Sequence, residues 1–98
     1  MIYVVATVHI RPETREKFLA GARACIAETV KEKGCVSYDL HESVTHPARF
    51  VFVERWEERG NLDGHFVAPH FKVWRAVGAE CILDRKVEIV HADKVETL

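Results

Sequence analysis

The sequence predicts an α+β fold, a ferredoxin-like β-α-β-β-α-β sandwich with an antiparallel sheet. Three observations predict it. Four segments have the apolar, β-branched composition of strands, and two longer segments have the apolar spacing of helices. Only a short turn separates the two middle strands. With 98 residues, 48% of them hydrophobic and 30% charged, we expect a single globular domain over residues 1–98.

The first strand is expected at Ile2–Ile10, where apolar or β-branched residues occupy both parities, as in a strand covered on both faces. Pro12 suits the start of a helix because its missing N–H is not needed there. The next helix is expected over residues 13–33, where apolar residues share one stripe, and Gly34 ends it. Two charge pairs on it are interpreted as a solvated face: Glu28/Lys31 and Glu32/Lys33.

Residues 35–44 alternate between apolar and polar side chains, and residues 49–57 form another strand pattern after a turn at residues 45–48. The short connection predicts an antiparallel hairpin. Residues 60–78 predict a helical region that Pro69 breaks, because proline lacks the N–H that a helix interior needs. Residues 84–95 contain the last strand.

Composition excludes several classes of function. A net charge of −1 offers no basic surface for nucleic acid, and no run reaches the roughly 18 apolar residues of a membrane span. The N-terminal apolar run alternates with polar residues, unlike a signal peptide. Cys25, Cys35 and Cys81 are odd in number and lack C-x-x-C spacing, so we interpret them as buried thiols of a cytoplasmic protein.

The sheet face away from the helices is predicted to be apolar, since the strands carry apolar residues on both parities. A second copy packed sheet to sheet is the simplest cover, which predicts a homodimer through this open face. The alternative is a monomer with an apolar face.

His65 lies on the inward stripe of the broken helix, between Leu62 and Phe66. An imidazole in an apolar pocket can act as a general base near neutral pH. The alternative is a core histidine that hydrogen-bonds a backbone carbonyl.

Glu54 shares a strand face with aromatic residues, where a carboxylate must be paired or have a raised pKa. It either orients His65 or forms a salt bridge with an arginine, within the chain or across the dimer. Five large rings can line an apolar pocket for a flat aromatic ligand or simply form core: Tyr38, Phe52, Trp56, Phe71 and Trp74.

No metal site is predicted. His65 and His70 are five residues apart across a proline, unlike the i, i+4 pair that faces one ion on a helix. The other histidines have no ligand spacing.

An ordered set of motifs resembles the antibiotic biosynthesis monooxygenase family and spans nearly the whole chain. It comprises G-C-x-x-Y at residues 34–38, a proline-containing turn at 47–50, E-x-W at 54–56 and H-x-x-x-P-H-F at 65–71. The resemblance implies a ferredoxin-like homodimer that forms an α+β barrel. It also implies oxidation of a quinol or anthrone by dioxygen without flavin, haem or metal. Gly64 departs from the family, which usually has alanine there.

The resemblance also implies roles for the residues singled out above. His65 would be the base or proton shuttle and Glu54 its partner. Tyr38 and Trp56 would form a hydrogen-bonding wall, and the ring would be held by His70, Phe71 and Trp74, with Phe52 in the same pocket.

A cofactor-independent quinol monooxygenase is therefore the leading hypothesis. One alternative is an isomerase or epimerase of a small hydroxy-keto compound, which would use the same histidine and glutamate. The other is a non-catalytic dimer that binds a small molecule.

Overall fold

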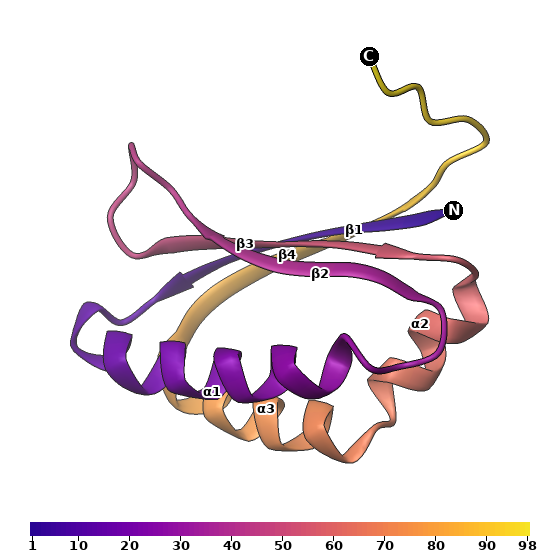
Figure 1. The fold of residues 1–98 in the computed structure, drawn as a ribbon. Coiled ribbons are helices and arrows are strands. Elements are labelled where there is room, and N and C mark those ends of the chain that lie inside the picture. The colour runs from indigo at the N-terminus through magenta and orange to yellow at the C-terminus, as the bar shows by residue number, and fades with distance from the viewer.

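Four strands and three helices form two layers, with the sheet on one side and the helices on the other (Figure 1). The computed structural model describes residues 1–98. The strands are β1 (Ile2–Ile10), β2 (Cys35–Glu42), β3 (Arg49–Trp56) and β4 (Ile82–His91). The helices are α1 (Arg15–Thr29), α2 (Arg59–Phe66) and α3 (Pro69–Cys81), and a 3-10 turn, η1 (Pro12–Thr14), precedes α1.

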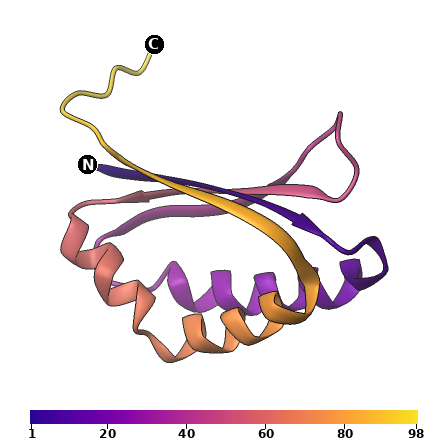
Figure 2. The ribbon, with the colours of Figure 1, turned by 180° about the vertical axis from the view of Figure 1, so that it is seen from behind.

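The sheet is antiparallel throughout, in the order β2-β3-β1-β4. This order and the alternation of strands and helices confirm the predicted ferredoxin-like α+β fold. Seen from behind, the helices again lie on one side of the sheet only, and β4 runs along the sheet edge above α3 (Figure 2). No helix of the protein has the length and apolar character needed to cross a membrane.

The predicted elements are all present, with shifts at several ends. The first helix ends at Thr29 and not near residue 33, because residues 30–34 form a turn in which Gly34 has a φ of 79°. Pro69 divides the second helical region as predicted. Ala68 before it is extended, as residues preceding proline prefer. β4 begins at Ile82, directly after α3 and two residues earlier than residue 84.

The helix-side face of the sheet forms the core. The even-numbered residues of β1 point toward the helices and are between 1% and 8% exposed. On β3, Phe50, Phe52 and Trp56 share this face and are buried, and so does Glu54. Glu54 therefore points toward the helices and not toward the open face, which settles its direction.

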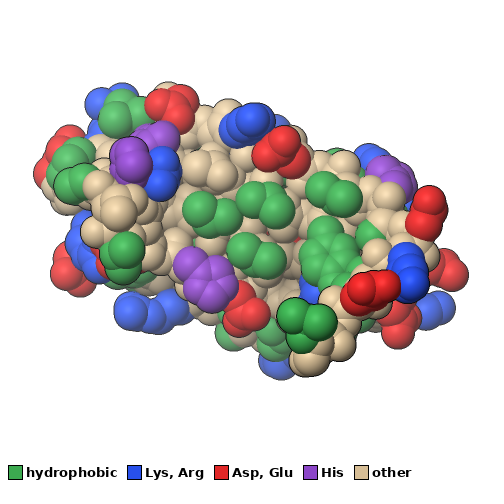
Figure 3. Space-filling view, turned by 90° about the horizontal axis from the view of Figure 1, so that it is seen from above, with side chains coloured by type: hydrophobic (Ala, Val, Ile, Leu, Met, Phe, Trp, Pro, Cys, Tyr) green, Lys and Arg blue, Asp and Glu red, His purple; other side chains and the backbone are tan.

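The opposite face of the sheet has no cover within the chain. Register places Val5 beside Val53 and Thr7 beside Val51 on this open face. Tyr3, Val5, Val51 and Val53 are half-buried. Figure 3 looks down on this face: apolar side chains gather over its middle, and charged side chains lie mostly toward its margin.

Candidate functional site

A cavity of about 80 Å³ lies between the helix-side face of the sheet and the kinked pair α2 and α3. Ten of its 13 lining residues are hydrophobic. Most of the residues proposed from the sequence line it: Tyr38, Phe52, Glu54, His65, Phe71 and Trp74. The structure therefore brings these side chains from β2, β3, α2 and α3 to one place.

Trp56 and His70 do not line the cavity. Trp56 is fully buried behind it, with its ring centroid 5.1 Å from that of His65. His70 lies on the other side of His65, with the two ring centroids 5.9 Å apart.

Two features of α2 position His65: the cap at its N-terminus and the buried side of the helix on which His65 lies. At the N-terminus, Glu58 and Asn61 form a reciprocal capping box that satisfies free backbone N–H groups. Leu62 and His65 then fall on the buried side of the helix. The imidazole packs edge-on against the Tyr38 and Phe71 rings, at centroid distances of 5.3 Å and 4.7 Å.

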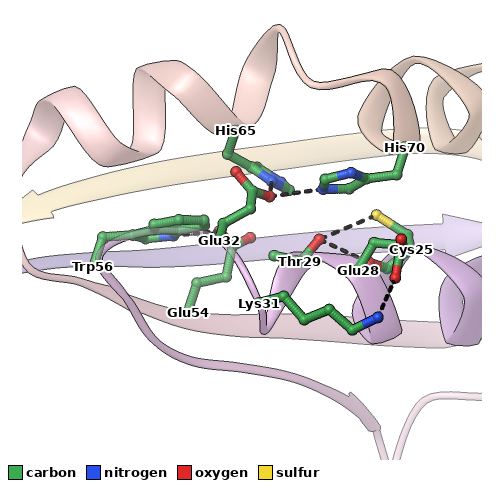
Figure 4. Close-up of polar contacts among 9 residues, drawn as sticks. All are labelled: Cys25, Glu28, Thr29, Lys31, Glu32, Glu54, Trp56, His65 and His70. Atoms are coloured by element: carbon green, nitrogen blue, oxygen red, sulfur yellow. Dashed lines mark hydrogen bonds and ion pairs between the residues drawn. The ribbon is translucent and has the colours of Figure 1, made fainter.

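The hydrogen-bond partner of His65 is Glu32. One carboxylate oxygen of Glu32 lies 2.6 Å from His65 Nδ1 and 2.7 Å from His70 Nε2 (Figure 4). A carboxylate oxygen only accepts, so each ring nitrogen donates its N–H to it. His65 Nε2, on the other side of the ring, is buried without a hydrogen-bond partner.

The sequence interpretation of Glu32 as part of a solvated face is wrong, since its side chain is 16% exposed. Glu32 follows α1 in a turn: its N–H bonds Thr29 O at 2.9 Å, and its carbonyl accepts from Cys35 N at 3.2 Å. This turn directs the carboxylate toward α2 and α3. Glu28, by contrast, pairs with Lys31 at the surface, as expected.

His65 and His70 face one point, although their spacing differs from the i, i+4 pair that does so on a continuous helix. Their spacing excludes a shared point on a continuous helix, but the break before Pro69 turns both rings toward Glu32. The three donor atoms lie within 4.8 Å of one another, a grouping also found around transition metal ions. The two short distances from Glu32 to the histidines are those of hydrogen bonds.

Glu54 is 5% exposed and forms no ion pair. Its Oε1 accepts from Trp56 Nε1 at 3.0 Å. Burial raises the pKa of its carboxyl to about 7, although the bond from Trp56 opposes this shift. Burial also raises the pKa of the Tyr38 phenol, so Tyr38 stays a hydrogen-bond donor at neutral pH.

Burial lowers the pKa of His65, whereas the hydrogen bond and the charge of Glu32 act in the opposite direction. The imidazole is therefore neutral near pH 7. One lining residue that the sequence reading missed is Arg85 on β4, the only arginine or lysine in the cavity wall. The pairing of Arg85 with Val8 places it on the helix-side face of an edge strand.

The chain matches one family model and is similar to several known proteins. The family model described as antibiotic biosynthesis monooxygenase matches residues 1–77. YcnE of Bacillus subtilis, a candidate monooxygenase by its name, is 31% identical over 96 residues, 98% of this chain and all of that protein. An uncharacterised Synechocystis protein, sll1783, is 36% identical over 70 residues, 71% of this chain, and this chain spans 48% of its length.

Rv0793 of Mycobacterium tuberculosis is also a candidate monooxygenase by its name. It is 38% identical over 88 residues, which are 90% of this chain and 85% of that protein. Its structure superposes with a TM-score of 0.88 over 98% of both chains, at 33% identity.

Proposed function

Because this chain belongs to the antibiotic biosynthesis monooxygenase family, we propose that it oxidises a small aromatic quinol or anthrone with dioxygen and without a bound cofactor. The observation that carries the proposal is the unpartnered Nε2 of His65, which lies in an aromatic cage beside the cavity. We place the protein in the cytoplasm, where its three free cysteines persist as thiols.

The proposed reaction begins when His65 Nε2 takes the proton of a phenol or of its keto tautomer. The resulting anion gives an electron to O₂, and the two radicals combine to form a peroxide anion. This anion takes the proton back from His65 and becomes a hydroperoxide. The hydroperoxide then loses water. One oxygen atom stays in the product carbonyl and the other leaves in the water, so atoms and electrons balance.

The other side chains bind and stabilise the substrate. Tyr38 donates a hydrogen bond to the oxygen on which negative charge develops. Phe52, Phe71 and Trp74 hold the ring. Trp56 acts indirectly, because its N–H is bonded to Glu54.

The size of the cavity limits the substrate. At about 80 Å³ it is smaller than the cavity of about 150 Å³ that holds one benzene ring in an engineered protein. A substrate therefore enters only when part of the wall moves outward. Arg85 and Val87 of β4 are the exposed part of that wall.

The test is oxygen uptake by the metal-stripped protein with a panel of dihydroxynaphthalenes and anthrones. We expect uptake that survives chelator and falls about 100- to 10,000-fold in His65→Ala, the usual contribution of a general base. His46→Ala, which alters an exposed histidine on the β2–β3 turn, is the matched control. Unchanged oxygen uptake in His65→Ala would show that His65 is not the base.

Glu54 supports a second candidate, an isomerase or epimerase of a small hydroxy-keto compound. Its pKa of about 7 gives the cavity a second group, besides His65, that can exchange a proton near neutrality. Solvent deuterium would then enter a hydroxy-keto substrate without oxygen uptake. Saturable binding of aromatic compounds with neither reaction would instead indicate a non-catalytic binding protein.

A homodimer through the open sheet face also belongs to this proposal. The apolar side chains in the middle of that face have no cover within the chain (Figure 3). A second copy placed sheet to sheet would remove them from water.

A further inference from the structure

We propose that Glu32 is the positioning residue of His65: it holds the imidazole as the Nδ1–H tautomer and stabilises the imidazolium that forms, while His70 fixes the Glu32 carboxylate. The proposal rests on the proposed function for its chemical role. Its geometric part is independent of any substrate.

The two ring nitrogens of His65 have different surroundings. Nδ1 faces Glu32 Oε2 at 2.6 Å, and Nε2 is buried without a partner. A neutral imidazole has one N–H, and the partner of one nitrogen decides which nitrogen carries it. Glu32 thus keeps the proton on Nδ1 and leaves Nε2 free to accept one.

Glu32 also provides the negative charge that a protonated His65 needs. His65 is 1% exposed, and burial disfavours its cationic form. Four other ionisable side chains approach its ring or its cavity: Tyr38 from β2, Glu54 from β3, His70 from α3 and Arg85 from β4. Glu32 alone hydrogen-bonds the ring, so it is the group that stabilises a proton gained at Nε2.

His70 completes the arrangement from the outer side. Its side chain is 20% exposed, and its Nε2–H donates to the same oxygen at 2.7 Å. Two donors on one oxygen restrict the rotation of the carboxylate, which follows α1 in a turn (Figure 4).

The experiment is a histidine side-chain ¹⁵N NMR titration of the metal-stripped, full-length protein without substrate. We expect the wild-type signals of His65 to show a protonated Nδ1 and an unprotonated Nε2. In Glu32→Gln the shape is kept and the charge is lost, so the proton affinity of His65 should fall about tenfold or more. His70→Ala should instead raise the midpoint slightly, because the charge of His70 opposes protonation of His65.

Glu28→Gln is the matched control, because this exposed carboxylate is also near the end of α1, but its ion pair is with Lys31 and it makes no hydrogen bond to His65. It should leave the tautomer and the midpoint of His65 unchanged. A wild-type Nε2–H tautomer, or an unchanged midpoint in Glu32→Gln, would overturn the proposal. So would stoichiometric binding of micromolar Zn²⁺ that displaces the Nδ1 proton, since the cluster would then be a metal site.

Because the titration uses no substrate, it separates this inference from the proposed function. The expected tautomer without oxygen uptake would support the role of Glu32 and count against a monooxygenase. For an active enzyme, the acid limb of the pH–rate profile should move with the NMR midpoint in Glu32→Gln.

Discussion

Gly34 and Asn61 are in such close contact that a Cβ added to Gly34 would overlap the Asn61 side chain. Gly34 belongs to the turn that carries Glu32, and Asn61 caps the helix that carries His65. The contact therefore joins the two segments that bring Glu32 and His65 together. Gly34 O also accepts from Glu57 N at 2.8 Å, which ties the turn to the end of β3.

We expect Gly34→Ala to destabilise the protein by about 1–3 kcal/mol, because its φ of 79° strains any residue with a Cβ. The clash with Asn61 adds to this cost. Chemical denaturation at fixed protein concentration measures the change. Unaltered stability, with the His65–Glu32 hydrogen bond intact by NMR, would contradict the role given to this contact.

Gly64 offers the opposite case. A Cβ there would meet nothing within 4 Å, and the residue lies inside α2. Gly64→Ala should therefore stabilise the protein by about 0.5–1 kcal/mol, since glycine loses more backbone entropy than alanine in a helix. The same denaturation measurement checks it, and a loss of stability would show that α2 needs the flexibility of Gly64.

The patterns that predicted the fold were local. The six β-branched residues within Ile2–Ile10 and the proline at residue 69 mark features that depend on neighbours in sequence. Glu32 could not be found this way, because it lies beyond the end of α1, where helical spacing no longer says which way a side chain points. Its role depends on two histidines more than thirty residues away.

The sheet face on which the Glu54 side chain lies could not be predicted from local sequence patterns either. Both faces of β3 carry apolar residues, so alternation alone assigns no face to the helices. Packing against α1, α2 and α3 decides it, and burial then sets the pKa. The sequence identifies the aromatic residues that share a strand face with Glu54. It does not identify the hydrogen-bond donor to Glu54, which is the indole N–H of Trp56 two residues later.

Glu54→Gln should make the protein progressively more stable than wild type as pH rises. The folded-state pKa of Glu54, about 7, exceeds the usual 4.5, so folding favours the protonated carboxyl. Its contribution is complete below about pH 4.5 and is lost as pH rises through about 7. Over this pH range the contribution of Glu54 to the free energy of unfolding changes by on the order of 3 kcal/mol.

The stability difference between Glu54→Gln and wild type, measured from pH 4 to pH 9, isolates this effect. Glutamine can still accept from Trp56 Nε1 through its amide oxygen. His65 has the opposite linkage, since its lowered pKa makes stability fall as pH drops, but it is present in both proteins and cancels in the difference. A difference that does not vary with pH would show that Glu54 ionises normally.

Val53→Lys should convert a dimer into a monomer. Val53 is half-buried in the open face beside Val5, and a lysine there would place a charge within the proposed interface. Val73→Lys, on a 65% exposed position of α3, introduces the same charge outside that face and should leave assembly unchanged. Sedimentation or light scattering gives the mass of each variant. A monomeric wild type, or a Val53→Lys protein that remains dimeric, would show that the open sheet face is not the interface between copies.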